Sequence, residues 1–284
     1  MPLLIALIAP LAWGSTYALV NLSLAGLSPF WVACWRALPA GILLLLLRPR
    51  WPSLPWGKLF ALAFCNIAAF FILLFLAAYH LPGAVAGTLG ATLPLMLLLL
   101  GWVLDRQRPP LGWLLNALLG LAGVIMLLDP SSHLDPVGVV CMLAATLLVG
   151  ISARWMQRWE TGDLLVITGW QLLLGGLMLV PVAWMVAGPM PMPSLHALPG
   201  LGYLVLVNTA LAYWAWMWGL RRLGTRTMGM LALVNPVVAV SLGVMLVNEQ
   251  LAPLQWCGIA TVLGSLVLMK LPLHRLFRRT PLPA

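Results

Sequence analysis

Arg36 is the charged residue whose position in the sequence most strongly suggests chemistry. It lies in the apolar stretch from Pro29 to Pro39, which reads PFWVACWRALP. A guanidinium keeps its charge and offers parallel N–H donors that match a carboxylate. Arg36 therefore predicts a site for a carboxylate substrate. A structural role, in which Arg36 bonds helix-end carbonyls or reaches outward to the membrane surface, fits the sequence equally well.

Three amides and one carboxylate complete the candidate polar set. Gln171 is the apparent counterpart of Arg36 in the second half of the chain (171 − 36 = 135, an offset that also pairs Gly41 with Gly176), and it is uncharged. Asn66 and Asn208 lie deep in apolar stretches, where asparagine commonly bonds between helices, so we expect them to bond across the bundle in a structural or coupling role. Glu249 lies at a helix end and is the best titratable candidate for coupling.

Aromatic residues outnumber these polar groups, with 15 Trp and 4 Tyr in the chain. Some of them fall deep in apolar stretches, where they predict an aromatic pocket. Stacking and cation–π contacts in such a pocket suit an amphipathic zwitterion such as a large amino acid. Part of the set must instead face lipid or fill the core. The substrate-binding candidates beside Arg36 and Gln171 are Trp13, Tyr17, Phe70, Tyr213 and Trp214.

The sequence contains no motif for metal binding, ATP binding or enzymatic catalysis. The four cysteines form no C-x-x-C pair and the four histidines are scattered, so we expect no metal site and no cofactor. No Walker loop for ATP is present. An enzyme would need a convergent nucleophile or acid–base pair, which the sequence does not indicate. Acidic residues fall at span ends, so facilitated export fits as well as proton antiport.

The elements that must position these residues are membrane spans. The chain of 284 residues is 63% hydrophobic and 7% charged, too apolar to cover a water-soluble fold. Apolar runs of about 20 residues, the length that crosses a bilayer, recur along it. We predict an all-α polytopic protein with ten spans, at 3–21, 29–47, 58–79, 83–104, 111–128, 136–153, 164–187, 198–220, 227–247 and 253–270.

The basic residues predict how these spans are oriented. Every second loop carries Lys or Arg and the loops between carry none, while Arg36 alone lies within a span. By the positive-inside rule both termini and all even-numbered loops are cytoplasmic. The net charge of +9 then reflects orientation in a cytoplasmic (inner) membrane, and we expect no nucleic-acid partner. The expected partners are the lipid bilayer and a small-molecule substrate, with the protein a monomer.

The second half of the chain repeats the first at a constant offset (236 − 94 = 142). Matched pairs include Asn66/Asn208, Gly87/Gly229 and Pro94/Pro236. Five spans in each half would invert the second copy, which predicts an inverted repeat of residues 1–130 and 131–284, the latter with a short basic C-terminal tail. Pro94 and Pro236 each remove a backbone donor, so we expect a helix break there that serves as hinge or gate.

Several local patterns resemble the EamA-type family of the drug/metabolite transporter superfamily. They are Trp13-Gly14-Ser15-Thr16, Pro29 to Arg36, Asn235-Pro236, Asn248 to Leu251, Gly258 and Gly264. The chain departs from that family where Asp105-Arg106-Gln107-Arg108 follows the fourth span and where the sixth span lacks a tryptophan. The resemblance implies a ten-span 5+5 inverted bundle that moves small metabolites, often exporting amino acids, around a central cavity.

These observations together predict a secondary transporter that exports small amphipathic metabolites by alternating access. Amino acids, aromatic or hydrophobic ones in particular, are the leading substrates. The alternatives are a sugar-nucleotide or drug carrier of the same superfamily and a membrane partner subunit that transports nothing. A nucleotide would call for more cations in the cavity than Arg36 alone.

Overall fold

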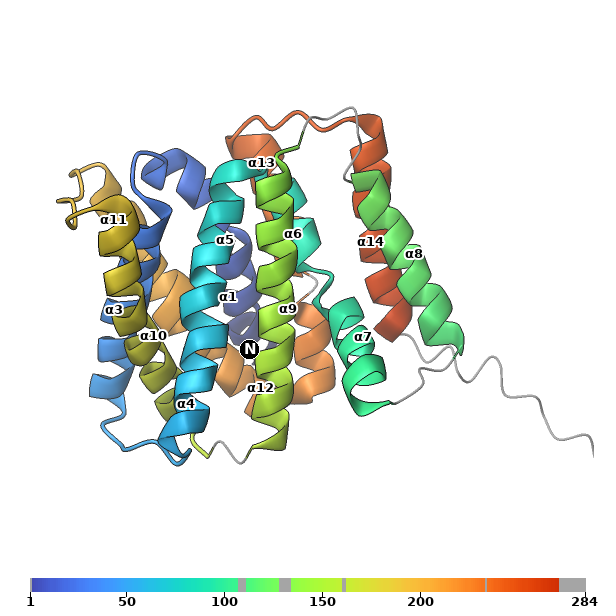
Figure 1. Ribbon diagram of the computed structural model, residues 1–284. Helices are drawn as coiled ribbons and strands as arrows, with labels where there is room; N and C mark the ends of the chain where they lie inside the picture. The colour runs from blue at the N-terminus through green and yellow to red at the C-terminus, as the bar shows by residue number, and fades with distance from the viewer. Residues whose placement is uncertain (1, 107–110, 128–133, 160–161, 233, 271–284) are drawn as a thin grey trace, which may run out of the picture.

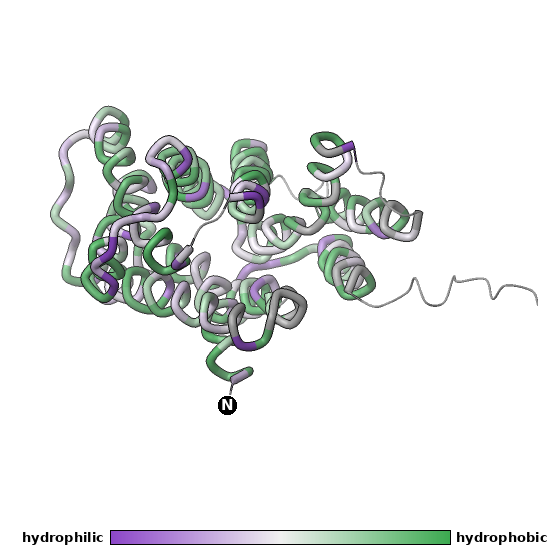
Figure 2. Tube along the Cα trace, turned by 90° about the horizontal axis from the view of Figure 1, so that it is seen from below, coloured by the Kyte–Doolittle hydropathy of each residue, from purple (hydrophilic) through white to green (hydrophobic). Residues whose placement is uncertain are grey.

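The computed structural model describes residues 2–106, 111–127, 134–159, 162–232 and 234–270. Within these ranges the regular structure is helical and no strand occurs (Figure 1). The helices run broadly alongside one another, and strongly hydrophobic segments occur along helices on every side of the molecule (Figure 2). Large apolar side chains such as Leu46 (73% exposed) and Met185 (84% exposed) face outward. Such an exterior suits lipid rather than water.

The helices of the first half are interrupted at several points. The first apolar stretch bends by 44° between Pro2–Gly14 and Thr16–Leu24, and the third contains a π-helical turn. In chain order the elements are α1 (Pro2–Gly14), α2 (Thr16–Leu19), η1 (Val20–Leu24), α3 (Pro29–Leu47), α4 (Trp56–Ala63), η2 (Phe64–Ala68), α5 (Ala69–His80), α6 (Gly83–Gly90), α7 (Leu93–Asp105) and α8 (Leu111–Leu127).

The second half begins with two long uninterrupted helices. Their starts are fixed by Asp135 and Asp163, whose side chains accept hydrogen bonds from Val137 N and Leu165 N. The elements are α9 (Pro136–Arg158), α10 (Leu164–Ala187), α11 (Ala197–Val205), η4 (Leu206–Leu211), α12 (Ala212–Leu231), α13 (Val234–Leu246) and α14 (Pro253–Lys270).

The predicted spans are recovered in part. Among the described residues, six helices are long and apolar enough to cross a membrane, seven if the bent first pair is one span, and α13 and most of α8 are shorter apolar helices. The prediction of a loop at residues 221–226, between the eighth and ninth spans, is wrong. Helix α12 continues through these residues and ends at Leu231. That segment has no helix-breaking proline, so its arginines do not end the helix. The basic C-terminal tail and Arg108 lie outside the described residues.

The predicted helix breaks are present at both prolines. The helix that begins at Gly83 stops at Gly90 and resumes at Leu93, one residue before Pro94. Likewise α12 stops at Leu231 and α13 starts at Val234, two residues before Pro236. Proline suits the first turn of a helix, where its missing N–H would have no intrahelical partner.

Other backbone irregularities recur at the repeat offset. The π-helical turns η2 and η4 begin at Phe64 and Leu206 (206 − 64 = 142). Arg106 and Asn248, again 142 apart, have φ angles of 54° and 57° and are the non-glycine residues with positive φ in the described part of the chain. Irregularities of this kind cost energy and do not recur at one offset by helix propensity alone.

Small residues let particular helix pairs pack closely. The pair α3 and α10 lies side by side (Figure 1), and a Cβ on Gly41 would approach Leu173 N to 2.6 Å. The pair α8 and α14 forms a unit at one edge of the molecule, where a Cβ on Gly258 would lie 2.5 Å from Leu127 N. Close backbone approach through small residues is how helices associate in lipid.

Candidate functional site

The centre of the candidate site is the guanidinium of Arg36, on α3. Its side chain is 3% exposed, so it does not reach outward to the membrane surface. Nε donates to Thr209 Oγ1 at 3.1 Å, and the guanidinium carbon lies 4.4 Å from the ring centre of Phe71. Phe75 lies on the same side, at 5.9 Å. Phe71 and Phe75 are four residues apart on α5 and so share one helix face.

The contacts of Arg36 leave part of its charge uncompensated. Nη1 is buried and makes no hydrogen bond within the described part of the chain. Arg36 is also the one charged side chain that this part buries. Aromatic faces stabilise a desolvated cation by about 2 kcal/mol, while an unpaired charge in lipid costs at least about 2.5 kcal/mol. The unbonded donor is therefore free to bind an anionic group.

Two tyrosines and a tryptophan accompany Arg36. Tyr17 and Tyr213 lie near its guanidinium. Trp13 packs its ring edge against Tyr213, with centroids 5.6 Å apart, and donates from Nε1 to the Asn208 carbonyl at 3.0 Å. The predicted residues Trp13, Tyr17, Arg36 and Tyr213 thus lie in one neighbourhood.

The π-helical turn η4 presents two of the polar residues at this centre. Asn208 Nδ2 donates to the Ala12 carbonyl and, at 3.0 Å, to Thr16 Oγ1, while its Oδ1 is buried without a partner in the described residues. Thr209 donates to the Leu204 carbonyl five residues earlier at 2.8 Å and accepts from Arg36. The wide turn therefore ties α1 to one side of η4 and α3 to another.

A second polar pair lies apart from this centre. Asn66, in the π-helical turn η2, donates to Gln171 Oε1 at 2.9 Å. Gln171 is 2% exposed and also approaches Met156 Sδ at 3.9 Å. The expectation that Asn66 and Asn208 bond across the bundle is confirmed, and each bonds to a different helix: Asn66 to α10, and Asn208 to the first apolar stretch.

The remaining aromatic candidates take other positions. Phe70 is partly buried and contacts Phe71 at a ring distance of 5.6 Å, so it adjoins the centre without touching Arg36. Trp214 is 39% exposed and stacks on Trp218, which turns it outward. The sequence-based selection missed Phe75 and Thr209, and placed Phe70 ahead of Phe71. The i, i+4 spacing of Phe71 and Phe75 was the available signal.

Glu249 joins the second half of the chain to the first. Its carboxylate accepts hydrogen bonds from the backbone N–H groups of Gly83 and Ala84, at 2.6 and 3.0 Å, at the start of α6. A carboxylate at a helix N-terminus is favoured by the helix dipole. Gly83 is also in contact with Tyr17, since a Cβ there would lie 2.7 Å from the Tyr17 Cβ. The contact thus connects this helix end to the wall of the Arg36 site.

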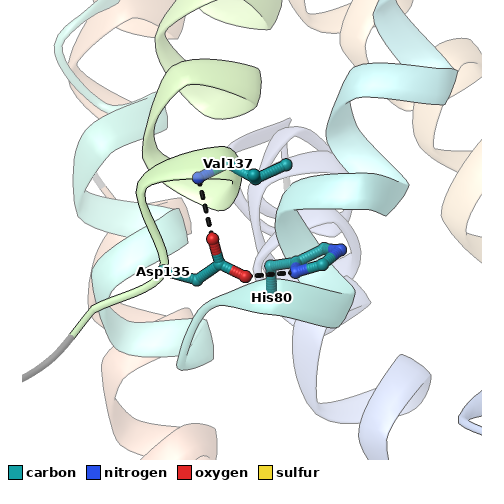
Figure 3. A network of polar contacts seen from close by, with 3 residues as sticks. All are labelled: His80, Asp135 and Val137. Carbon is teal, nitrogen blue, oxygen red and sulfur yellow. Dashed lines mark hydrogen bonds and ion pairs between the residues drawn. The ribbon is translucent and has the colours of Figure 1, made fainter.

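A further polar contact closes the end of α5 against the start of α9 (Figure 3). Asp135 accepts from Val137 N at 2.8 Å and bonds His80 Nδ1 at 2.5 Å. The hydrogen bond from Val137 N–H, helped by the bond to His80, holds the pKa of Asp135 below its usual range.

No group of three or more metal-ligating side chains occurs among the residues that the structure describes.

Comparison with known proteins gives one family. The model of the EamA-like transporter family matches residues 1–129 and 136–271. PecM from Dickeya dadantii is 34% identical over 271 residues, covering 93% of this chain and 91% of that protein. The uncharacterized inner membrane transporter YedA from Escherichia coli K12 is 30% identical over 289 residues, covering 95% and 91%. A crystal structure at 19% identity superposes with a TM-score of 0.69 over 96% of this chain and 98% of its own, which is a likeness of fold alone.

Proposed function

The chain belongs to the EamA-like transporter family, and from that premise we propose that it exports small amphipathic metabolites across the inner membrane. Amino acids are the proposed substrates, with aromatic and hydrophobic ones foremost. The observation that carries this proposal is the buried Arg36 guanidinium, which has an unbonded Nη1 and two phenylalanine rings beside it.

The substrate carboxylate would bind to Arg36 Nη1, and its side chain would contact the surrounding aromatic residues. Charge-assisted hydrogen bonds in a site of low dielectric are strong and directional, which selects for a carboxylate. Trp13, Tyr17, Tyr213 and Phe71 offer the aromatic surface. Gln171, Phe70 and Trp214 belong to the proposed binding set on sequence grounds, although Gln171 bonds Asn66 away from Arg36 and Trp214 is turned outward.

The proposed transport mechanism is alternating access between two inverted five-helix repeats. The shared offset of the π-helical turns, the positive-φ residues and the proline breaks supports such a duplication. Inverted repeats open a midplane site to either side by exchanging conformations. The breaks beside Pro94 and Pro236 would be the hinges, and both termini would be cytoplasmic by the positive-inside rule.

The experiment is efflux from liposomes that contain purified protein and are loaded with radiolabelled amino acids, sugars and nucleotides in parallel. We expect efflux of a carboxylate amino acid without any imposed gradient, and no acceleration by a pH gradient if transport is facilitated. Acceleration by the gradient would indicate proton antiport. Efflux of a nucleotide or sugar alone would favour the alternative carrier. If folded protein gave no efflux of any compound in the panel, the result would favour the alternative of a membrane partner subunit that transports nothing.

A further inference from the structure

A pocket opens on the side of the bundle where α3 ends and α4 and α10 begin. It has a volume of about 410 Å³, and its walls are the side chains of Ile42, Leu45, Leu46 and Leu173. Ile42 and Leu46 are 49% and 73% exposed, so the pocket faces the surroundings of the bundle. This wall of branched apolar side chains can hold a hydrocarbon chain, and it does not include Arg36.

Polar and aromatic groups gather at one end of this pocket. Trp51 and Trp170, which line it, stack with ring centroids 5.5 Å apart, and Trp56 packs edge-on against Trp170 at the same distance. Trp170 Nε1 donates to the backbone carbonyl of Arg50 at 3.0 Å, which holds the Arg50 backbone at the mouth. Tryptophan prefers the level of the lipid headgroups, so this end lies at the membrane–water interface.

The charge at the mouth is available to a ligand. Arg48 forms an ion pair with Asp163 at 3.9 Å, whereas the structure records none for Arg50 among the described residues. An apolar slot with an exposed arginine at its interfacial end is complementary to an amphiphile with an anionic head. A basic pocket between membrane helices is the usual form of a headgroup site.

We propose that this pocket binds an anionic phospholipid, with an acyl chain between Ile42 and Leu173 and the phosphate at Arg50. The bound lipid would bridge the end of α3, the loop after it and the start of α10. The site is separate from the proposed transport site, in which the guanidinium of Arg36 is buried inside the bundle. Lipid binding can therefore be lost while substrate binding is kept.

The test is native mass spectrometry of detergent-solubilised protein mixed with phosphatidylglycerol or with phosphatidylcholine of the same acyl chains. We expect wild-type protein to retain phosphatidylglycerol preferentially. Arg50→Gln should lower that preference roughly fivefold, the effect of one charge near an anionic headgroup. Ile42→Trp, which fills the slot from an exposed position, should reduce retention of the lipid itself.

The matched control is Arg222→Gln. Arg222 is also exposed and lies beside a tryptophan, 5.9 Å from the Trp218 ring, but it does not line the pocket. The control should keep the wild-type preference. Equal retention of the two lipids by the wild type, or an equal loss in Arg50→Gln and Arg222→Gln, would overturn the proposal. Intact thermal unfolding of each variant would show that the protein had folded.

Discussion

The π-helical turns η2 and η4 begin 142 residues apart and make different contacts. Asn66 and Asn208 stand 142 residues apart in these turns. Asn66 makes a single side-chain bond, to Gln171 at 2.9 Å. Asn208 donates to Ala12 of α1 and to Thr16 of α2, and its neighbour Thr209 accepts from Arg36. Both turns place an asparagine inside the bundle. The side chains around each turn differ, and they determine that η4 and not η2 contacts Arg36.

The same lesson applies to Arg36 and its apparent counterpart Gln171. Both are buried on helices that pack against one another, α3 and α10. Gln171 satisfies its amide locally, whereas Arg36 keeps an unbonded donor among aromatic rings. A buried neutral amide with a hydrogen-bond partner commonly stabilises helix packing in a membrane. A buried cation with an unbonded donor instead indicates a functional site.

The largest effect is expected from making the two halves alike at this position. Arg36→Gln replaces the guanidinium with the side chain of its counterpart, and should lower efflux of a carboxylate amino acid by roughly 10- to 150-fold, the usual value of a hydrogen bond to a charged group. Arg36→Lys keeps the charge without the planar donor pair and should retain an intermediate rate. The measurement is initial efflux from liposomes that contain equal amounts of folded protein.

Undiminished efflux by Arg36→Gln would refute the role of Arg36 in binding the carboxylate. A variant that no longer elutes as a single species from size exclusion would instead report a folding defect. Arg36→Lys then decides, since it preserves the packing against Phe71 and should fold.

The sequence predicted the helix breaks because their cause is local. Pro94 and Pro236 remove a backbone donor wherever they stand. Whether Phe71 faces Arg36 depends on how α5 is rotated about its axis. The π-helical turn η2, directly before α5, changes that rotation. A pattern with a 3.6-residue period cannot locate that shift, so Phe70 was ranked ahead of Phe71. The partner of Asn66 depended on which helix packs against η2, which is a tertiary fact.

A second effect is expected from matched glycines of the two halves. Gly101 and Gly243 are 142 residues apart, yet a Cβ on Gly243 would lie 2.7 Å from the Glu249 carboxylate carbon, while one on Gly101 would meet Arg154 Nη1 at an ordinary 3.6 Å. Gly243→Ala should therefore displace the carboxylate from Gly83 and Ala84 and cost about 1–3 kcal/mol for the donors left unpaired. Gly101→Ala should be close to neutral. Thermal unfolding in detergent measures both, and equal losses would contradict the assignment.

A third, smaller difference is expected between the two asparagines. Asn208→Ala removes one bond to α1 and one to α2, and Asn66→Ala removes one bond to Gln171. At an average of about 0.6 kcal/mol for each interhelical bond in a membrane, the losses are roughly 1.2 and 0.6 kcal/mol. Unfolding midpoints at a fixed detergent concentration test the order of the two variants. A larger loss for Asn66→Ala would mean that η2, not η4, is the more strongly constrained turn.

The smallest effect concerns the different ways in which the two halves begin. The second half starts with Asp135, which caps α9, whereas α1 of the first half starts at Pro2. Because the pKa of Asp135 is held below its usual range, chiefly by the Val137 N–H, the carboxylate stabilises the fold above about pH 4, the ordinary aspartate range, and this contribution is lost as the pH falls through the lowered value.

Asp135→Ala should accordingly lower the unfolding midpoint slightly at neutral pH, and the gap between variant and wild type should close on acidification. His80→Gln is the matched control, because it removes the second bond to Asp135 but leaves the one from Val137 N–H in place. It should preserve most of the acid-dependent difference. If His80→Gln abolished that difference as fully as Asp135→Ala, the contact with α5 rather than the helix cap would be the source of the stability.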